Sequence, residues 1–234
     1  MRAMQSPSRH RLMLLPTMLS AAVFLAGCAQ DPIVQSFVGS TMGSAYEVKV
    51  VTDHPIADVR SLVAQELLAF DVTFSNWRDN SEMMRVNAHR STEPLEISER
   101  FRALLQHALR IAKGTGGAFD PTIKPLSDLY RAAKEDPTVG IEDAQQVLAK
   151  ERVGYQKVSI QDGKLVKQHA DLVLDLDGIV AGAAADAIAA KLTALGIQSF
   201  YLQITGEVLC RGVKPDGTVW RIGVVDPSSD AAGG

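Results

Sequence analysis

The chain has 234 residues and a formal net charge of −3, and aromatic residues make up 6% of it. It contains no block of lysines and arginines and no basic stretch rich in aromatics, which argues against nucleic acid as a partner. The length after residue 27 suits one large domain or two small ones, and no stretch beyond that residue is apolar enough to cross a membrane.

The first residues predict export and a lipid anchor. A basic start precedes an apolar run from Leu12 to Ala26, which is too short to span a bilayer and is typical of a signal peptide. The run ends in Leu25-Ala26-Gly27-Cys28, which resembles a bacterial lipoprotein signal in which the cysteine receives the lipid. The alternative is a cleaved secretory signal with an incidental cysteine. We expect a signal peptide over 1–27, a tether over 28–36 and a domain over 37–234, anchored in the bacterial periplasm to the inner or outer membrane.

The mature chain mixes helices and hairpins. Apolar spacing predicts an extended run over 36–51, helices over 55–70 and 141–151, and a helix capped by Ser98 that ends at the glycines of 114–117. A polar loop is expected over 73–87, and prolines 121 and 125 exclude a helix between them. Asp162-Gly163 predicts a hairpin over 158–167. Strands are expected over 172–176, 200–210 and 219–225, with a helix over 183–195. Without a βαβ rhythm, this pattern favours an α+β fold of helices and antiparallel hairpins.

The passage from an extended run into an alanine-rich helix at 171–186 is the strongest chemical signal. Asp175 and Asp177 end the extended run, and Gly178 precedes the helix. A helix N-terminus suits a phosphate, whereas two carboxylates repel one unless a cation lies between them. The segment therefore predicts a phosphate–metal site. An ordinary Asp N-cap is the alternative.

Other common sites are absent from the sequence. It has no GxxxxGK[ST], GxGxxG or GxSxG motif, and none of its five histidines is paired at metal-ligand spacing. The usual phosphate loops, a zinc site and a serine-hydrolase elbow are therefore not expected. Cys210 lies in an apolar run and is expected to be a small core residue.

Four ordered segments together resemble the ApbE family of FAD:protein FMN transferases. They are Gly-Ser-Thr-Met-Gly-Ser-Ala-Tyr (39–46), Ser-Asn-Trp-Arg-Asp-Asn-Ser-Glu-Met-Met-Arg-Val-Asn (75–87), Gly-Gly-Ala-Phe-Asp-Pro-Thr-Ile-Lys-Pro-Leu (116–126) and Asp-Leu-Asp-Gly-Ile-Val-Ala-Gly-Ala-Ala-Ala-Asp (175–186). The resemblance implies an ApbE or T-fold-like domain. It also implies an enzyme that binds FAD and Mg²⁺, moves FMN to a Thr or Ser hydroxyl of a client protein, and releases AMP.

The resemblance also assigns roles to aromatic and apolar positions. Met42 is expected to contact the flavin, with a core methionine as the alternative. Trp77 stands where the family commonly has tyrosine and is expected to stack on a ring of the dinucleotide. Gly43 would let a planar ligand approach the backbone closely.

Further positions follow from the third and fourth segments. Ala118, Phe119 and Asp120 are expected to line the cofactor site, and for Asp120 the cap of a turn at Pro121 is an equal alternative. The resemblance implies that Asp175 hydrogen-bonds FAD. It also implies that the backbone carbonyl of Gly178 binds the metal.

Two departures from the family bear on activity. Ala181 replaces a lysine that helps to hold the cofactor in the family. The family also continues beyond the Trp-Arg-Ile-Gly strand matched by 220–223, with a segment that holds the Asp and Thr ligands of magnesium. We expect the domain to be incomplete at its C-terminus, with weak or no transferase activity if the chain is whole. The alternatives are a non-catalytic FAD-binding lipoprotein, an inactive fragment, and a scaffold or small-ligand binder without flavin.

Overall fold

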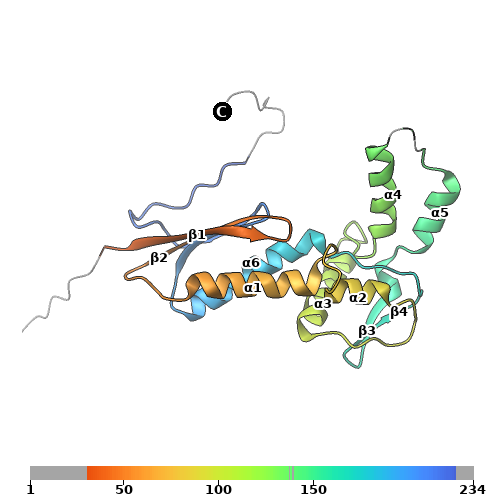
Figure 1. The fold of residues 1–234 in the computed structure, drawn as a ribbon, viewed down its shortest axis with the longest axis horizontal. Coiled ribbons are helices and arrows are strands. Elements are labelled where there is room, and N and C mark those ends of the chain that lie inside the picture. The colour runs from red at the N-terminus through yellow and green to blue at the C-terminus, as the bar shows by residue number, and fades with distance from the viewer. Residues whose placement is uncertain (1–30, 137, 139, 225–234) are drawn as a thin grey trace, which may run out of the picture. The chain divides into compact units, whose positions relative to one another are not determined.

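The computed structural model describes residues 31–136, 138 and 140–224, so the expected signal peptide and Cys28 lie outside the described residues. The elements are β1 (Ile33–Thr41), β2 (Ser44–Thr52), α1 (Val59–Phe74), α2 (Glu82–Ala88), α3 (Glu99–Gly114), α4 (Lys124–Glu135), α5 (Asp143–Glu151), a 3-10 turn (Tyr155–Lys157), β3 (Val158–Gln161), β4 (Lys164–Lys167), α6 (Asp177–Ala194), β5 (Ser199–Ile204) and β6 (Glu207–Arg211) (Figure 1). In this part of the chain, no helix combines the length and the apolar character that a membrane span needs.

A four-stranded antiparallel sheet in the order β1-β2-β5-β6 forms the larger layer. Side chains alternate between its two faces. One face gathers the buried residues of the two central strands, and the register pairs them as Tyr46 with Ile204, Val48 with Leu202 and Val50 with Phe200. This face is the sheet's contribution to the core.

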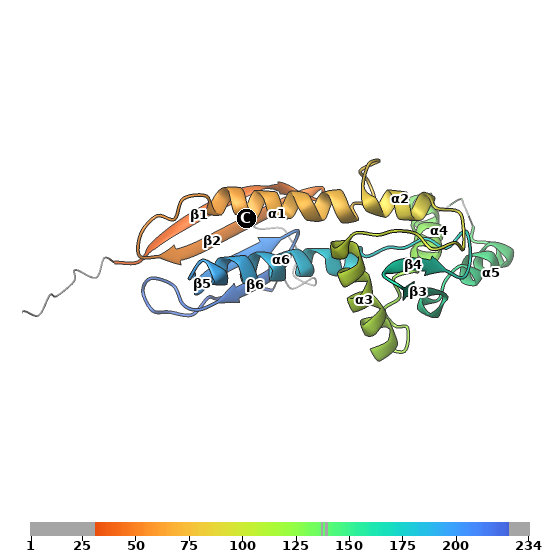
Figure 2. The same cartoon turned by 90° about the horizontal axis from the view of Figure 1, so that it is seen from below.

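Helices α1 and α6 lie along that face, as Figure 2 shows. The buried apolar residues of α1 recur at helical spacing, so one stripe of the helix packs inward; they are Val59, Val63, Leu67, Phe70 and Phe74. In α6 half of the buried residues are alanines, and the others are Val180, Ile188 and Leu192. The core therefore combines large side chains from α1 and the sheet with a mixture of small and large ones from α6.

A buried carboxylate connects three helices in this layer. Glu66 of α1 is 4% exposed, and its two oxygens lie 2.5 Å from Arg100 of α3 and 2.5 Å from Lys191 of α6. Burial alone would raise the pKa of Glu66, but the bonds from Arg100 and Lys191 outweigh it and lower that pKa.

Several sequence predictions hold in the structure. The Ser98 hydroxyl accepts the N–H of Phe101 at 3.1 Å and caps α3. The hairpin of β3 and β4 turns at Asp162-Gly163, where both residues have positive φ, as a primed turn requires. The helix expected over 141–151 is α5, and the α+β class is confirmed.

The boundaries expected in the first part of the chain need correction in four places. The tether over 28–36 overlaps β1, which begins at Ile33, and the extended run over 36–51 is a hairpin that turns at residues 42–43. The helix expected over 55–70 begins at Val59, because Asp58 adopts a left-handed conformation (φ 69°) that a helix cannot include. The polar loop expected over 73–87 contains a helix, α2, and Ser81 is the N-cap of that helix.

The expected strands of the second half need correction as well. Residues 172–176 form no strand, and the run over 200–210 is β5 and β6, which turn at Thr205-Gly206. Among residues 219–224 only Val219 forms a bridge, to Val213. The helix over 183–195 begins earlier, at Asp177.

Cys210 is exposed rather than buried. It pairs with Tyr201, one position out of phase with the core residues, so it points to the sheet face that α1 and α6 leave uncovered. An apolar run on an edge strand therefore does not imply burial on both faces.

Candidate functional site

A cavity of about 200 Å³ opens where the first turn of α6 meets the end of α1 and two hairpin turns. Its lining residues are Met42, Phe70, Phe74, Ser75, Asn76, Trp77, Asp177, Val180, Ala181 and Thr205. They come from the first, second and fourth segments of the family resemblance, together with α1 and the β5–β6 turn. Sequence-distant motifs thus converge on one hollow.

Met42 reaches this cavity from the β1–β2 turn. Its φ is 48°, and Gly43 follows at 74°, so the pair forms a turn with two left-handed residues. A left-handed methionine is uncommon and strained, and such strain is often found at functional sites. The positive φ at position 43 favours glycine, so the turn alone explains why Gly43 stands there, and no nearby ligand is needed to explain it. Met42 is only partly buried against the core, so the core-methionine alternative holds only in part.

Trp77 is 81% exposed on an ordered loop. The Ser75 hydroxyl accepts the backbone N–H groups of Trp77 and Arg78, both at 3.2 Å, and so fixes the loop that follows α1. A fixed loop with an open indole face is suited to stacking on a ligand ring.

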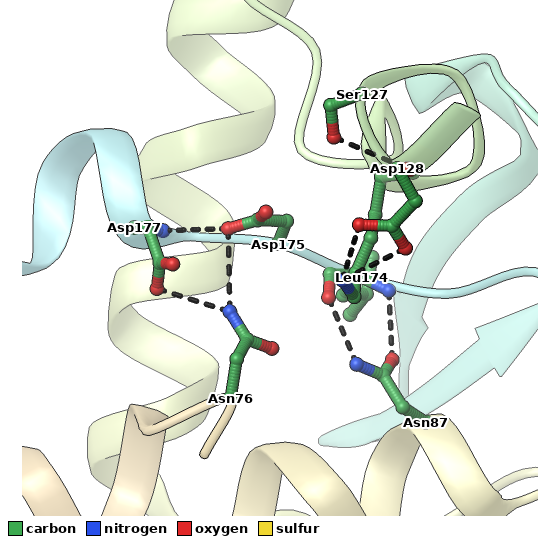
Figure 3. A network of polar contacts seen from close by, with 8 residues as sticks. Asn76, Asn87, Ser127, Asp128, Leu174, Asp175 and Asp177 are labelled. Atoms are coloured by element: carbon green, nitrogen blue, oxygen red, sulfur yellow. Dashed lines mark hydrogen bonds and ion pairs between the residues drawn. The ribbon is translucent and has the colours of Figure 1, made fainter. Parts of the chain in front are cut away.

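Two carboxylates lie at the start of α6 and share one amide partner. The Nδ2 group of Asn76 donates to Asp177 at 3.0 Å and to Asp175 at 3.4 Å (Figure 3). Asp175 also accepts the N–H of Asp177 at 2.9 Å, so it satisfies a free donor of the helix N-terminus. The N-cap residue of α6 is Leu176, which makes no side-chain capping bond, so the alternative of an Asp N-cap is wrong, although Asp175 one position earlier bonds the first helical N–H. Because Asn76 contacts both acids, it also links them to the loop that carries Trp77.

The environment disfavours a second negative charge in this cluster. Burial of the carboxylate and the neighbouring Asp175 raise the pKa of Asp177, while the Asn76 hydrogen bond and the charges of Lys124 and Arg131 oppose that rise. The Oδ1 atom of Asn76 is buried without a hydrogen-bond partner. A cation beside the two acids would relieve their repulsion.

The donors present fit only part of a magnesium site. Among the described residues, no group of three or more His, Cys, Asp or Glu side chains is placed to hold a metal ion. Magnesium commonly takes one or two carboxylates and completes its shell with water and substrate phosphates. Asp175 and Asp177 can supply such a partial set, with the Gly178 carbonyl nearby in the chain.

Asp120 is committed to holding a turn. One of its oxygens accepts the N–H and the hydroxyl of Thr122, at 2.8 and 2.6 Å, and the other accepts the N–H of Tyr155 at 2.9 Å. The Thr122 hydroxyl, fully buried, accepts the N–H of Gly154 at 2.7 Å. These bonds support the turn-cap interpretation of Asp120.

The third motif adjoins the cavity but does not line it. The Pro121 carbonyl accepts the N–H of Asp175 at 2.8 Å, which places this turn directly beside the acidic segment. Phe119 is partly buried and lies next to Gly178, where an added Cβ would be 3.5 Å from its ring. Ala118 is exposed. None of residues 118–120 is among the residues that line the first cavity.

A second hollow of about 600 Å³ lies against another side of the same helix start. One face of α3 contributes cationic or titratable side chains at helical spacing, Arg100, His107 and Arg110, and α6 contributes Gly178 and Gly182. This hollow was not predicted from the sequence, although the spacing of Arg100, His107 and Arg110 places them on one face of a helix.

Ala181 lies in the wall of the first cavity and is 5% exposed. Among the described residues, Asp177 is the only ionisable one in that wall, so none of their lysines, arginines or histidines there replaces the missing charge. Asn76 was also missed by sequence analysis, because an asparagine in a polar loop is typical of turns in general.

Comparisons with known proteins agree with the motifs. The model of the ApbE family matches residues 42–233. The FAD:protein FMN transferase of Vibrio cholerae is 32% identical over 216 residues, which cover 91% of this chain and 65% of that protein. The enzyme of the same name from Klebsiella pneumoniae is 32% identical over 90% of this chain and 64% of its own length.

Solved structures match as well. Flavin transferase ApbE from Vibrio cholerae superimposes with a TM-score of 0.77 at 30% identity, covering 84% of this chain and 65% of that one. Apo flavinyl transferase ApbE from Pseudomonas stutzeri does so with a TM-score of 0.75 at 34% identity, covering 82% of this chain and 62% of that one. The chain thus spans about two thirds of the length of the curated relatives that it matches. With its fold, its four motifs and these matches in agreement, the chain belongs to the ApbE family.

Proposed function

We propose that this chain carries the flavin-binding part of an FAD:protein FMN transferase. The observation that carries the proposal is the cavity that brings together Met42, Trp77 and Asp177, residues of three motif segments, in one wall. Relatives named FAD:protein FMN transferase match over about nine tenths of the chain. In the proposed reaction, a Thr or Ser hydroxyl of a client protein attacks the FMN phosphorus of FAD, and AMP leaves.

In this proposal, the residues of the chain position the ligand. Trp77 stacks on one ring, and Met42 covers the flavin from the β1–β2 turn. Asp175 and Asp177, with the Gly178 carbonyl, would hold a Mg²⁺ ion, which would supply positive charge against the diphosphate. Such chemistry depends on position and charge more than on covalent participation by the protein.

The roles of the third motif follow from its hydrogen bonds. Asp120 acts by fixing the turn whose Pro121 carbonyl holds Asp175, and Ala118 and Phe119 flank the ligand from the side of Gly178. Asp120 is thus a positioning residue in this proposal.

We also propose that the protein is a periplasmic lipoprotein anchored through Cys28. The basic start, the apolar run and the cysteine that ends it support this proposal. Metabolic labelling with a palmitate analogue should mark the wild type and fail to mark Cys28→Ser. Equal labelling of both would contradict the anchor.

The transfer proposal is tested with purified chain, FAD, Mg²⁺ and a client protein. The expected product is a client band whose flavin fluorescence survives denaturing electrophoresis, with release of AMP. Omission of Mg²⁺ is the matched control and should abolish the band. If the folded chain binds FAD and yields neither product with any client tested, transferase activity is contradicted.

A non-catalytic FAD-binding lipoprotein is the second candidate. It is favoured by the absence of a cation from the wall of the first cavity, where Ala181 stands. It predicts tight FAD binding, measured by quenching of flavin fluorescence, without release of AMP.

A further inference from the structure

The acidic segment, residues 171–177, carries Asp175 between β4 and α6. Residues 171–176 form no helix or strand, although Leu172, Leu174 and Leu176 are fully buried. Buried backbone N–H and C=O groups need hydrogen-bond partners. No strand among the described residues pairs with this segment. Its hydrogen-bond partners therefore determine where its carboxylates lie.

Asn87, in the last turn of α2, supplies two of those partners. Its Oδ1 accepts the N–H of Leu174 at 2.7 Å, and its Nδ2 donates to the Leu174 carbonyl at 2.9 Å (Figure 3). One side chain thus pairs with both backbone groups of one residue, as a neighbouring strand does in a sheet. The residue that it pairs with directly precedes Asp175.

Lys167 holds the same segment from β4. Lys167 is 1% exposed, and its ammonium group donates to the Leu172 carbonyl at 3.1 Å and to the Val86 carbonyl at 3.2 Å. Val86 is the neighbour of Asn87 in α2, and a cation near a helix C-terminus is favourable. Lys167 therefore ties the end of α2 to the acidic segment two residues before Leu174.

The other end of α2 is bonded to the Trp77 loop, residues 75–78. The Ser81 hydroxyl caps α2 by accepting the N–H of Met84 at 3.0 Å, and it donates to the Ser75 carbonyl at 2.7 Å. Ser81 is 2% exposed, so this link is shielded from water. The seven residues of α2 thus connect the Trp77 loop at one end with the acidic segment at the other, about 10 Å apart at 1.5 Å per residue.

We propose that α2 is a spacer that sets the acidic segment relative to the Trp77 loop, with Asn87 as the positioning residue at its acidic end and Lys167 as the support of that contact. The consequence for FAD binding rests on the proposed function, whereas the placement of the two carboxylates does not. Asn76 closes the arrangement, because its amide reaches from the Trp77 loop to Asp175 and Asp177.

The test compares Asn87→Ala with Asn80→Ala in the full chain. Asn80 lies in the same stretch of sequence, is exposed and makes no side-chain hydrogen bond among the described residues, so it is a matched control. The first readout is hydrogen exchange at the backbone amides of Asp175 and Asp177, followed by NMR, because these N–H groups bond the Pro121 carbonyl and the Asp175 carboxylate. We expect Asn87→Ala to speed exchange at both amides about tenfold, and Asn80→Ala to leave it unchanged.

The second readout is the dissociation constant of FAD, measured by flavin fluorescence. Asn87→Ala should weaken binding about tenfold at unchanged far-UV circular dichroism, while Asn80→Ala should bind as the wild type does. A folded Asn87→Ala chain with wild-type amide exchange at Asp175 and Asp177 and wild-type affinity for FAD would overturn the spacer.

Two further outcomes remain decisive. If the wild type does not bind FAD, the proposed function fails, and the amide exchange at Asp175 and Asp177 alone decides the spacer. If Asn87→Ala does not fold, Asn87→Asp replaces it, since the aspartate keeps an acceptor for the Leu174 N–H and cannot donate to the Leu174 carbonyl. Unchanged exchange at both amides in that variant would then overturn the proposal.

Discussion

The carboxylate of Asp175 accepts the backbone N–H of Asp177 at 2.9 Å, so two acids meet within one turn at the start of α6. Each carboxylate has a hydrogen-bond partner, yet burial and the charge of Asp175 both disfavour ionisation of Asp177. Such an arrangement is unfavourable for folding and suited to binding a cation. The first predictions follow from this imbalance.

Asp177→Asn should stabilise the folded chain at neutral pH by less than about 1 kcal/mol, because Asp177 is an exposed residue whose carboxylate is only partly shielded from water. The raised pKa of Asp177 means that its ionised form opposes folding. The gain is therefore present above that pKa and disappears as the pH falls through it toward 3.8, the ordinary value. Urea unfolding at several pH values measures it. Asp79→Asn, an exposed acid of the neighbouring loop, is the control, and an equal gain there would contradict the prediction.

Trp77→Ala should weaken FAD binding about tenfold or more, because stacking of one ring on an aromatic side chain contributes about 1–3 kcal/mol. Stability should change little, since the indole is 81% exposed. Flavin fluorescence reports the affinity independently of the lost tryptophan. Trp220→Ala is the matched control, because this indole donates to the Arg211 carbonyl and contacts Tyr201, away from the cavity. Equal losses in both variants would argue against stacking at Trp77.

Ala181→Lys should increase the affinity for FAD several-fold and lower the pKa of Asp177, because it places a cation in a cavity wall whose only ionisable residue is an acid. The affinity for riboflavin, which has no phosphate, should stay the same. Ala181→Met controls for side-chain size. A gain that Ala181→Met shares would show that volume rather than charge is responsible.

Asp120→Ala should destabilise the chain by about 2–4 kcal/mol, because it removes three hydrogen bonds and leaves their donors unpaired. On the surface, Asp136 bonds the N–H and the hydroxyl of Thr138 in the same way, and among the described residues it has no third partner. Asp136→Ala should therefore cost much less than Asp120→Ala. Denaturant unfolding compares the two. Weaker FAD binding by Asp120→Ala at unchanged stability would show instead that Asp120 contacts the cofactor.

Lys167 should make stability depend on pH in the alkaline range. Burial first, and then Arg90, lower the pKa of Lys167 to about 8, against the attraction of Asp171. The unfolded chain holds this proton up to about pH 10.5, so stability rises with pH between about 8 and 10.5. The rise from pH 7 to 10 should reach about 2 kcal/mol. In Lys167→Met it should be absent, and an identical pH profile in the two proteins would contradict the prediction.

Local chemistry accounts for the elements that the sequence predicted correctly. Ser98 caps α3 and Asp162-Gly163 turns the hairpin because each feature depends on residues within a few positions. The run over 172–176 alternates as a strand does, and its leucines are indeed buried. Whether it joins a ladder depends on a partner, and here Asn87, far away in sequence, takes the place of that partner.

Part of the site could also be predicted, because some of its residues belong to local sequence motifs. Met42, Trp77 and Asp177 belong to segments with a recognisable order, and the structure gathers them in one cavity. The bonds of Asp120 to Tyr155 and of Asn76 to the two acids connect segments 35 to 101 positions apart. No periodicity or turn signal encodes such contacts, so only the folded chain reveals them.

The outward orientation of Cys210 has a practical consequence. Its thiol lies on the strand face opposite α1 and α6, away from both hollows beside α6. A maleimide dye attached there would leave the wall of the proposed flavin site unmodified. Energy transfer between that dye and a bound isoalloxazine would then give a spectroscopic ruler for ligand occupancy in solution.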